Sequence, residues 1–537
     1  MLNKTFELKN IANYLKDNFS NTIEYSIGNK VIKKYYNEVY LDAIKALNNL
    51  CKLDIFADDI VVLYGDSSYY WLITEVACII GGIRTVALPE TLSISQAMSE
   101  LRKFKAKALI LDLKNEPSCT EENYCVITFD SLFENEIQES SIPDIYIDKA
   151  KYQITVYTSG TTSNIKSFEI LPEATEKLVL HLIQIFKINS KDRWLICHPF
   201  THYSHLEYAL GGLCSGYDLI ILNLTQSLIS FSNLKPSIFI SVPTSYYFFY
   251  ERFIEEIQSS NALTQIIIKL YIKLGMFIKY PRINNFLGRI FCKKLHNIMG
   301  GNLKFMIIGT APSLANIKEF FQKIGLPLFE GYGLTELGMI SMNDYSKNKL
   351  FTVGTIFPGI KVDFREDNVL WVKNSYQRMN KYLNEESDLI DKDGYICTGD
   401  IGEIDKAGFL KIVGRKKEII VTSTGKKINP IPIEQMFISY SEIKHCVLIG
   451  DNKPFISAII SPKEIQFKSN LEFENRINEI VKTINNDLSS AEKVLAAIIS
   501  KKEFSEKTGM VTRSQKIVRR KVEECHTYEI KKIYDEQ

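Results

Sequence analysis

Short apolar runs alternate with longer segments of helical spacing along most of the chain. The runs Ile60–Tyr64, Ala108–Asp112 and Leu219–Leu222 have the length and composition of buried strands. Between such runs, the apolar positions of Thr175–Phe186 recur at the period of a helix that buries one face. This alternation predicts an α/β fold with largely buried sheets.

The length of the chain and a change in its composition predict more than one domain. With 537 residues, the chain exceeds the roughly 250–300 residues at which a single hydrophobic core stops growing. Towards the C-terminus, lysine-rich segments enclose short strand-like runs at Phe409–Val413 and Cys446–Gly450. We therefore expect a large N-terminal α/β domain of several subdomains over 1–415 and a small α+β C-terminal domain over 416–537.

The apolar segment Thr264–Tyr280, with interspersed lysines, allows two interpretations. A basic amphipathic helix of this kind can lie on a membrane surface. Alternatively, the helix is packed within the protein and its lysines extend their charged ends to water. The packed helix is favoured, because apolar residues surround Lys269, Lys273 and Lys279 on most sides. Peripheral membrane contact stays open as the alternative.

The charge balance and the cysteine spacing limit the kinds of binding partner and the cellular compartment that the sequence predicts. Lys and Arg number 65 against 63 Asp and Glu, so no global field recruits nucleic acid. The ten cysteines lack the spacing of metal or redox motifs, which favours a reducing compartment. The N-terminus has no basic region followed by an apolar one, and the most apolar stretch, Trp71–Pro89, carries Glu75 and Arg84. These features predict a cytoplasmic protein.

A run of hydroxyl residues around one glycine follows the strand-like segment Tyr152–Tyr157. The sequence Thr158-Ser-Gly-Thr-Thr162 offers backbone N–H groups and hydroxyl donors to phosphate oxygens, and Lys166 adds a positive charge. The segment differs from the P-loop pattern, because Ile165 stands where that pattern requires a second glycine. Taken alone, a surface turn explains this segment equally well.

Two further glycine-containing segments carry polar groups suited to a nucleotide. In Phe329–Gly338 two glycines flank Tyr332 and let the backbone approach a flat ligand, while Thr335 and Glu336 supply the hard oxygen ligands that Mg²⁺ prefers. In Tyr395–Asp400 a carboxylate follows a glycine turn, which suits the hydroxyl groups of a ribose. Each segment alone is also compatible with an ordinary turn or hairpin.

Together and in this order, the three segments resemble the adenylate-forming, or AMP-binding, superfamily. The chain is most similar to long-chain fatty acyl-CoA synthetases, over nearly its whole length. Further family landmarks match at Gly309–Ser313, Gly354–Gly359 and Met379–Leu383. The resemblance implies that ATP activates a carboxylic acid, here a medium- or long-chain fatty acid, through an acyl-adenylate. A thioester with coenzyme A (CoA) would follow.

The resemblance also implies roles for individual residues of the ATP site. The β- and γ-phosphates would be held by Thr158, Ser159, Gly160, Thr161, Thr162 and Lys166. Magnesium would be placed by Thr161 and Glu336. The adenine and the adenylate would lie against Gly331, Tyr332 and Gly333, with Thr335 at the α-phosphate. The ribose hydroxyl groups would be held by Asp400 and Arg415.

Near the C-terminus, Thr512–Arg520 resembles the family segment that carries the catalytic lysine, and Lys516 takes that position. Lys516 would bridge the substrate carboxylate and the α-phosphate, where a flexible point charge suits developing negative charge. In the family, the small domain then rotates for thioester formation. Lys416 would be the hinge, and Gly425 would leave room for the pantetheine arm of CoA in the loop that replaces Lys516.

Two residues match acyl-pocket positions of the family. His202, within His198–His205, corresponds to the residue that gates the acyl tunnel. Gly333 stands where small-acid relatives often close the pocket with an aromatic residue, and a glycine leaves room for a chain. The three histidines of the first segment also raise a metal site, but Pro199 and the absent H-E-x-x-H glutamate speak against it.

The phosphate-loop segment departs from the family pattern. Ser163, Ile165 and Ser167 stand where relatives usually have glycine, proline and glycine, and the added side chains restrict the backbone. A non-catalytic acyl- or nucleotide-binding homologue therefore stays open. So does an acyl-AMP ligase that loads an acyl carrier protein. Basic residues that suit an acidic carrier as well as the CoA phosphates are Lys502, Lys507, Arg513, Arg519 and Arg520.

Overall fold

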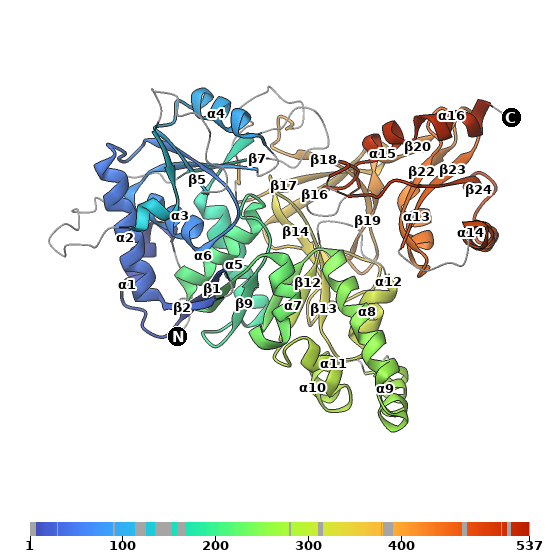
Figure 1. Ribbon diagram of the computed structural model, residues 1–537, viewed down its shortest axis with the longest axis horizontal. Helices are drawn as coiled ribbons and strands as arrows, with labels where there is room; N and C mark the ends of the chain where they lie inside the picture. The colour runs from blue at the N-terminus through green and yellow to red at the C-terminus, as the bar shows by residue number, and fades with distance from the viewer. Residues whose placement is uncertain are drawn as a thin grey trace.

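A large body and a smaller lobe make up the computed structural model of the chain (Figure 1). The lobe, orange to red in the figure, is formed by the C-terminal part of the chain. The residues that the structure describes are 7–28, 30–89, 92–112, 125–134, 153–157, 167–275, 277–278, 281–309, 315–376, 378–379, 390–463, 470–505, 507–512 and 517–535.

A nine-stranded sheet runs through the large body. Its strands are β1 (Thr22–Ile27), β2 (Lys30–Tyr35), β9 (Arg193–Ile196), β10 (Asp218–Ile221), β11 (Ile238–Ser241), β12 (Phe305–Ile308), β13 (Leu328–Leu334), β14 (Gly338–Met342) and β15 (Thr355–Ile356). Their order is β15-β14-β13-β12-β11-β9-β10-β1-β2. The strands from β13 to β1 in this order are parallel, and the strands at both edges are antiparallel.

A second sheet of six strands lies in the N-terminal part of the same body. Its strands are β3 (Ile60–Tyr64), β4 (Arg84–Leu88), β5 (Ala108–Leu111), β6 (Cys125–Thr128), β7 (Ile154–Tyr157) and β8 (Ser167–Ile170). Their order is β6-β5-β3-β4-β7-β8, and only the last pair is antiparallel. The apolar runs expected to be buried strands thus form β3, β5 and most of β10, so that prediction is confirmed.

Helices cover both faces of the two sheets. The cluster of apolar residues between the sheets includes side chains of α1 (Ile11–Lys16), α2 (Tyr36–Lys52), α3 (Tyr69–Gly81), α5 (Pro172–Phe186) and α6 (Tyr203–Ser215). The outer face of the six-stranded sheet is covered by α4 (Ile94–Lys103). The outer face of the nine-stranded sheet packs against α7 (Leu224–Leu234), α8 (Pro243–Ser259), α9 (Ala262–Gly275), α10 (Pro281–Phe291), α11 (Lys293–Ile298) and α12 (Ala315–Lys323).

The sequence of each central strand explains this layering. In β9, Trp194 and Ile196 belong to the cluster between the sheets, whereas Leu195 belongs to the cluster on the α7–α12 side. Successive side chains of a strand point to opposite faces, so a strand that is apolar throughout must be covered twice. The continuous apolar runs of the sequence therefore require helices on both faces.

Two smaller antiparallel assemblies lead into the C-terminal lobe. A four-stranded sheet consists of β16 (Ile360–Arg365), β17 (Val369–Asn374), β18 (Ile396–Ile404) and β19 (Leu410–Arg415). A two-stranded hairpin follows, made of β20 (Ile420–Val421) and β21 (Lys427–Ile428). The four-stranded sheet places Asp400 and Arg415 directly opposite each other.

The C-terminal lobe has its own sheet and its own core. Its three strands are β22 (Ile443–Ile449), β23 (Ile456–Pro462) and β24 (Val494–Ile499). Its helices are α13 (Pro430–Ile438), α14 (Asn470–Asn486), α15 (Arg519–Cys525) and α16 (Thr527–Asp535). Among the described residues, no buried apolar cluster joins residues before 411 to residues after 419. A large α/β domain with a small C-terminal domain is thus confirmed, and the boundary after residue 415 stays a prediction.

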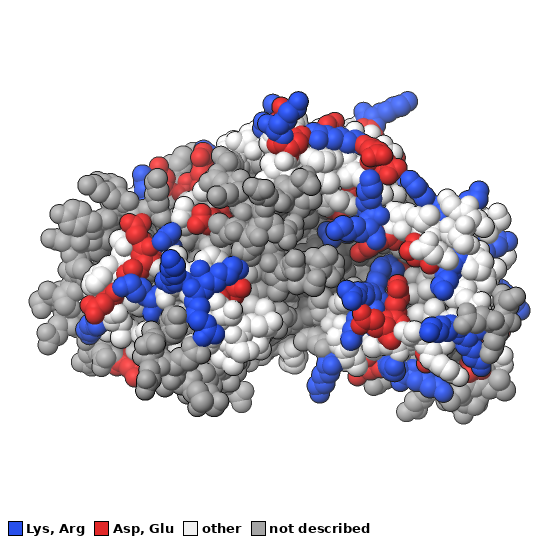
Figure 2. All heavy atoms as spheres, turned by 90° about the horizontal axis from the view of Figure 1, so that it is seen from above, with Lys and Arg blue, Asp and Glu red and all other residues white. Residues whose placement is uncertain are grey.

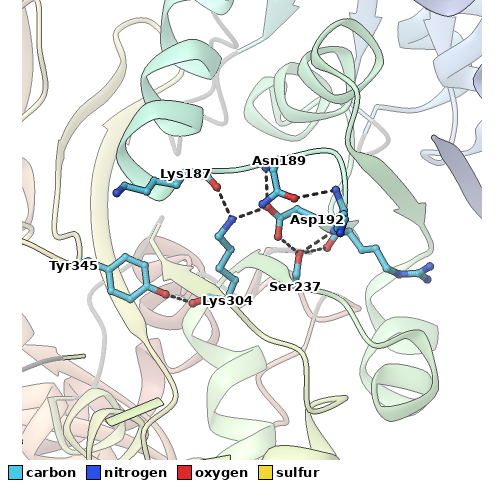
Figure 3. A network of polar contacts seen from close by, with 8 residues as sticks. Lys187, Asn189, Asp192, Ser237, Lys304 and Tyr345 are labelled. Carbon is cyan, nitrogen blue, oxygen red and sulfur yellow. Dashed lines mark hydrogen bonds and ion pairs between the residues drawn. The ribbon is translucent and has the colours of Figure 1, made fainter. Parts of the chain in front are cut away.

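A polar network fixes the amino ends of three neighbouring parallel strands (Figure 3). The Lys304 ammonium group donates to the carbonyl oxygen of Lys187 and to Asp192 Oδ2, both at 2.6 Å. The other carboxylate oxygen of Asp192 accepts a 2.9 Å hydrogen bond from Ser237. Lys304 and Ser237 immediately precede β12 and β11, and Asp192 immediately precedes β9. The network therefore ties these strands at the end opposite to their carboxyl edge, where ligands of α/β sheets usually bind.

The segment 264–280 differs from the favoured interpretation. It forms most of α9, and Ile268 and Tyr271 pack inward, but Leu263, Leu270 and Leu274 are more than half exposed. The prediction of a helix packed on most sides is therefore wrong, because no described element covers its outer face. No helix of the described ranges is both long enough and apolar enough to cross a membrane.

Candidate active site

The segment 329–338 begins as a parallel strand and ends in a tight turn. The pairing of β13 with β14 shifts register between Tyr332 and Gly333, and the backbone N–H of Leu337 donates to the carbonyl of Leu334 at 3.1 Å. A Cβ atom at position 333 would lie 2.4 Å from the carbonyl oxygen of Gly338, which itself has a φ of +73°. The turn therefore requires glycine at 333, independently of any acyl chain. Its acyl-pocket role stays a prediction.

Three residues predicted to bind the adenosine part of ATP meet at the start of this turn. The Tyr332 hydroxyl group donates to Asp400 Oδ2 at 2.5 Å, and Arg415 Nε donates to Asp400 Oδ1 at 2.8 Å. The Asp400 side chain is 4% exposed, whereas that of Arg415 is 49% exposed. Tyr332 and Arg415 lie 68 and 15 positions from Asp400 in the sequence, and both contact its buried carboxylate.

Burial and the Asp400 carboxylate set the protonation of this cluster. Burial, followed by the charge of Asp400, raises the pKa of the Tyr332 phenol well above its usual value. Burial alone would lower the pKa of Arg415, but the charges of Asp400 and Glu418 and the hydrogen bond to Asp400 together raise it. Tyr332 is therefore a neutral donor and Arg415 a full positive charge at neutral pH.

The donor set of the cluster fits the ribose of a nucleotide. A carboxylate oxygen carries two lone pairs, and each oxygen of Asp400 uses one of them for Tyr332 or Arg415. Acceptor capacity is left for two hydroxyl groups of a diol. The Asp400–Arg415 register across β18 and β19 holds the carboxylate in place for such a contact.

A buried ion pair supports the turn from behind. Arg378 donates from Nη1 and Nη2 to the two carboxylate oxygens of Glu207 at 2.7 and 3.1 Å, and its Nε donates to the carbonyl oxygen of Thr335 at 2.8 Å. The two side chains are 3% and 1% exposed. Arg378 thereby fixes the backbone between the two residues predicted to face the α-phosphate and magnesium, Thr335 and Glu336.

Sequence reasoning missed Arg378 and Glu207. Arg378 adjoins the Met379–Leu383 landmark, and Glu207 is a lone acid in the apolar helix α6. A single acid in such a helix signals a buried partner, since an unpaired charge is rarely buried. The identity of that partner does not follow from the sequence.

The described carboxylates are compatible with magnesium bound mainly through a nucleotide. Glu336 lies half-buried in the turn. No group of three or more His, Cys, Asp and Glu side chains in the described ranges could hold a metal ion by itself. Mg²⁺ in nucleotide sites usually takes one or two carboxylates together with phosphates and water. A single glutamate beside the phosphates fits that pattern.

The phosphate loop and the catalytic lysine lie outside the described residues. The predicted residues in this group are Thr158, Ser159, Gly160, Thr161, Thr162, Lys166 and Lys516. The two ends of the phosphate loop are described, because Tyr157 ends β7 and Ser167 opens β8 as its antiparallel partner. The Tyr157 hydroxyl group also donates to Glu100 at 2.5 Å. Ser167, one of the departures from the family pattern, therefore lies in regular strand that accepts a side chain.

The predicted hinge and the predicted CoA loop meet one acidic residue. Lys416 opens a short 3₁₀ turn, Lys416–Glu418, and its ammonium group lies 3.4 Å from Asp367. Lys427, within the segment 422–430 predicted as the CoA loop, lies 3.1 Å from the other carboxylate oxygen of Asp367. Gly425 turns the β20–β21 hairpin with a φ of +76° and open space around its Cα.

The segment His198–His205 contains two buried, neutral histidine rings, those of His198 and His205, and the half-buried ring of His202. Burial lowers the pKa of His198 to about 4, and its Nε2 lies 2.7 Å from the hydroxyl oxygen of Ser241. The His198 and His205 rings lie 4.8 Å apart. His202 is half-buried at the start of α6. Its role in an acyl tunnel stays a prediction.

One of the basic residues expected to face CoA or a carrier, Arg519, instead forms an ion pair within the C-terminal domain. The Arg519 guanidinium group pairs with Glu434, which is 9% exposed and also accepts a 2.7 Å hydrogen bond from the backbone of Leu448. Arg519 therefore joins α15 to α13 within the C-terminal domain. The expectation for this residue is wrong, because Glu434 is buried and requires a positive partner.

The surface charges of the described residues are mixed. Seen from above, Lys and Arg side chains lie among Asp and Glu side chains on both the large body and the C-terminal domain (Figure 2). This view agrees with the near-balance of 65 basic and 63 acidic residues in the sequence.

Comparison with known proteins identifies two family models along the chain. The model of the AMP-binding enzymes matches residues 24–370, and the model of the AMP-binding enzyme C-terminal domain matches residues 417–537. The first match alone covers more than half of the chain.

Individual relatives are similar over most of their length. The long-chain-fatty-acid–CoA ligase FadD15 of Mycobacterium bovis is 26% identical, over 91% of this chain and 90% of the relative. The human long-chain-fatty-acid–CoA ligase ACSBG2 is 24% identical, over 80% of this chain and 72% of the relative.

A solved structure shares the fold. It is the O-succinylbenzoate coenzyme A synthetase of Bacillus subtilis, in complex with ATP and magnesium ion. It superimposes with a TM-score of 0.72 at 17% identity, over 95% of this chain and 98% of that structure. The likeness at this identity concerns the fold.

Proposed function

The chain belongs to the AMP-binding enzyme family, and we propose that it is an AMP-forming acid-thiol ligase whose acid is a medium- or long-chain fatty acid and whose thiol is CoA. The family membership confirms the resemblance on which the site residues were predicted. The observation that carries the nucleotide site is the Asp400 carboxylate, held between Tyr332 and Arg415 at the base of the turn. The fatty acid is supported by the near full-length similarity to fatty-acid–CoA ligases.

In the first half-reaction, the carboxylate of the acid attacks the α-phosphorus of ATP. A carboxylate–phosphorus bond forms and the bond to pyrophosphate breaks, which gives an acyl-adenylate and free pyrophosphate. Asp400 would accept hydrogen bonds from the ribose, and Lys516 would neutralise charge shared by the carboxylate and the α-phosphate. The loop 158–166 would hold the outgoing phosphates. Mg²⁺, held by Thr161 and Glu336, would offset part of the phosphate charge.

In the second half-reaction, the CoA thiol attacks the acyl carbon, AMP leaves with its bonding electrons, and the thiol loses its proton. Rotation of the C-terminal domain about Lys416 would withdraw Lys516 and bring in the loop with Gly425. The contacts of Asp367 with Lys416 and Lys427 support a coupling of this hinge to this loop.

An ATP–pyrophosphate exchange assay tests the first half-reaction. The acids are a series from acetate to palmitate with several aryl acids, and the variants are Lys516→Ala and Asp400→Asn. We expect exchange to peak with medium or long chains and to fall by about 10²-fold or more in Lys516→Ala. Asp400→Asn should raise the KM for ATP. The matched control is Asp405→Asn, which removes a turn carboxylate that pairs with Lys349 on the surface.

The outcomes separate the alternatives. Exchange with aryl or short acids alone would overturn the fatty-acid assignment, and no exchange with any acid in a folded protein would overturn the ligase. Thioester formation with free CoA, compared with a phosphopantetheinyl carrier protein, decides the acceptor. Preference for the carrier would overturn CoA.

A further inference from the structure

Exposed apolar side chains gather on one helical hairpin of the large domain, made of α9 and α10. Among the described residues, ten of the 23 exposed large apolar side chains lie between residues 263 and 291. They are Leu263, Ile266, Ile267, Leu270, Leu274, Phe277, Ile283, Phe286, Ile290 and Phe291. In Figure 1 the hairpin forms the lower tip of the molecule. A patch of this size on a folded chain indicates an interaction surface.

The hairpin is firmly anchored, so its exposed face is not a loose arm. The Tyr271 hydroxyl group donates to the carbonyl of Asn284 at 2.9 Å and joins α9 to α10. Asn284 and Asn285 donate to the carbonyls of Gln322 and Gly325, at 2.6 and 2.9 Å, at the end of α12. These contacts fix which face of the hairpin turns outward.

Glycines let the hairpin approach this anchor closely. A Cβ atom on Gly275 would lie 2.2 Å from the carbonyl oxygen of Lys323, and one on Gly288 would lie 2.3 Å from that of Ile324. The inner face is therefore packed backbone to backbone, which leaves the large apolar side chains on the outside.

The apolar side chains of α9 form one stripe with lysines along its edge. At about 100° per residue, positions 263, 266, 267, 270 and 274 fall within an arc of about 100°. Lys269 and Lys273 border this arc on one side, and the buried positions Ile268 and Tyr271 lie on the other. An apolar stripe edged by lysines is the pattern of helices that lie in a membrane interface.

The charge of the surrounding sequence is of one sign. Residues 257–318 contain nine Lys and Arg and no Asp or Glu, in a chain with 63 acidic residues. Lys294 pairs with Glu256 at 3.1 Å, but no described acidic group pairs with Lys269, Lys273 or Lys293, all of which are exposed. A stretch of 62 positions with nine basic residues and no acidic residue favours an anionic partner.

We propose that the α9–α10 hairpin docks the protein on anionic lipid bilayers, with the apolar stripe between the lipid headgroups and Lys269, Lys273 and Lys293 at the lipid phosphates. Apolar burial and lysine attraction act together in such binding, each lysine near the surface adding about fivefold in affinity. A second copy of the chain fits less well, because a symmetric contact would place the same positive charges opposite each other.

Vesicle cosedimentation tests the proposal on the full chain. The vesicles are phosphatidylcholine with about one third phosphatidylglycerol, compared with pure phosphatidylcholine. We expect the protein to sediment with the anionic vesicles and to be released in 0.5 M salt, where the Debye length falls to about 4 Å. Leu274→Glu should lower binding at least tenfold, and Lys269→Gln with Lys273→Gln should lower it about 25-fold.

A matched substitution and a second measurement make the result decisive. Leu495→Glu places the same charge at an equally exposed leucine of β24, 64% exposed against 60% for Leu274, and should leave vesicle binding unchanged. Equal binding by Leu274→Glu and the unchanged protein, or no binding to anionic vesicles, would overturn the proposal. So would a dimer detected by light scattering that Leu274→Glu splits. Exchange activity with a soluble medium-chain acid, measured in parallel, reports any loss of folding or of the ligase separately.

Discussion

At the scale of single residues, the buried ion pair of Glu207 and Arg378 is the contact most sensitive to the loss of one partner. The two side chains are 1% and 3% exposed, and Arg378 also holds the carbonyl of Thr335. Removing one member leaves the other as a buried charge without compensation, which costs more than the pair itself contributes.

Glu207→Gln should therefore lower the free energy of unfolding of the large domain by about 3–5 kcal/mol. It should also lower pyrophosphate exchange, because the turn that carries Thr335 and Glu336 loses its fixed support. Urea unfolding followed by tryptophan fluorescence measures the first effect. Glu403→Gln, at a carboxylate that is 64% exposed, is the control and should change stability by less than about 0.5 kcal/mol. A loss of similar size in both variants would contradict the argument.

The Asp400 cluster and the Glu207–Arg378 pair differ in how far the sequence predicts them. Tyr332, Asp400 and Arg415 were predicted because each lies in a segment whose pattern resembles a family motif. Arg378 and Glu207 are 171 positions apart and belong to no such pattern. Their contact depends on how α6 packs behind the turn, and packing between distant segments has no local signal.

At the scale of helices and strands, apolar periodicity predicted which elements form but not what covers them. The runs in β3, β5 and β10 are apolar at every position, so burial on both faces follows from the sequence alone. In α9, the apolar periodicity does not distinguish a helix packed within the protein from a helix that lies on the surface. The exposed stripe arises because Asn284, Asn285 and the glycines turn the other face of the hairpin towards α12.

His296 makes the attachment of this hairpin region sensitive to acid. Its ring lies 2.9 Å from the carbonyl oxygen of Ile324, the residue after α12, and burial lowers its pKa to about 4. In the unfolded chain the pKa is about 6.5, so the unfolded state takes up the proton first. The stabilisation is complete above pH 6.5 and is lost as the pH falls towards 4.

When the pH is lowered from 7.5 to 5.5, protonation of His296 in the unfolded chain should therefore lower the free energy of unfolding by about 1.4 kcal/mol. Native-state hydrogen exchange of the α11 amides, corrected for intrinsic rates, measures this loss, and His296→Gln should abolish it. His181→Gln is the control, since that ring is only partly buried and far from α11 in sequence. An unchanged pH dependence in His296→Gln would refute the assignment.

At the scale of the whole molecule, the two domains keep separate cores and meet through few fixed charges. In the described part of the chain, ion pairs join residues before and after position 415 at two places: Asp367 with Lys416 and Lys427, and Glu251 with Lys463. The sequence predicted the hinge by resemblance, but not these contacts. Exposed ion pairs add little to stability, so their effect falls on domain orientation.

Asp367→Asn should loosen the orientation of the C-terminal domain without unfolding either domain, because it releases Lys416 and Lys427 together. The pKa of Asp367 is lowered by the hydrogen bonds of Lys427 and Lys416, so the contact is charged at neutral pH. We expect trypsin to cleave after Lys416 or Lys417 several-fold faster in the variant, at an unchanged thermal midpoint.

In 0.5 M salt, screening should raise the rate of the unchanged protein towards that of the variant. Asp363→Asn, which removes one of the two acidic partners of Arg365 on the same sheet, should leave the cleavage rate unchanged. Equal cleavage of the two variants would show that Asp367 does not hold the hinge, and domain orientation would then depend on Lys463 and Glu251.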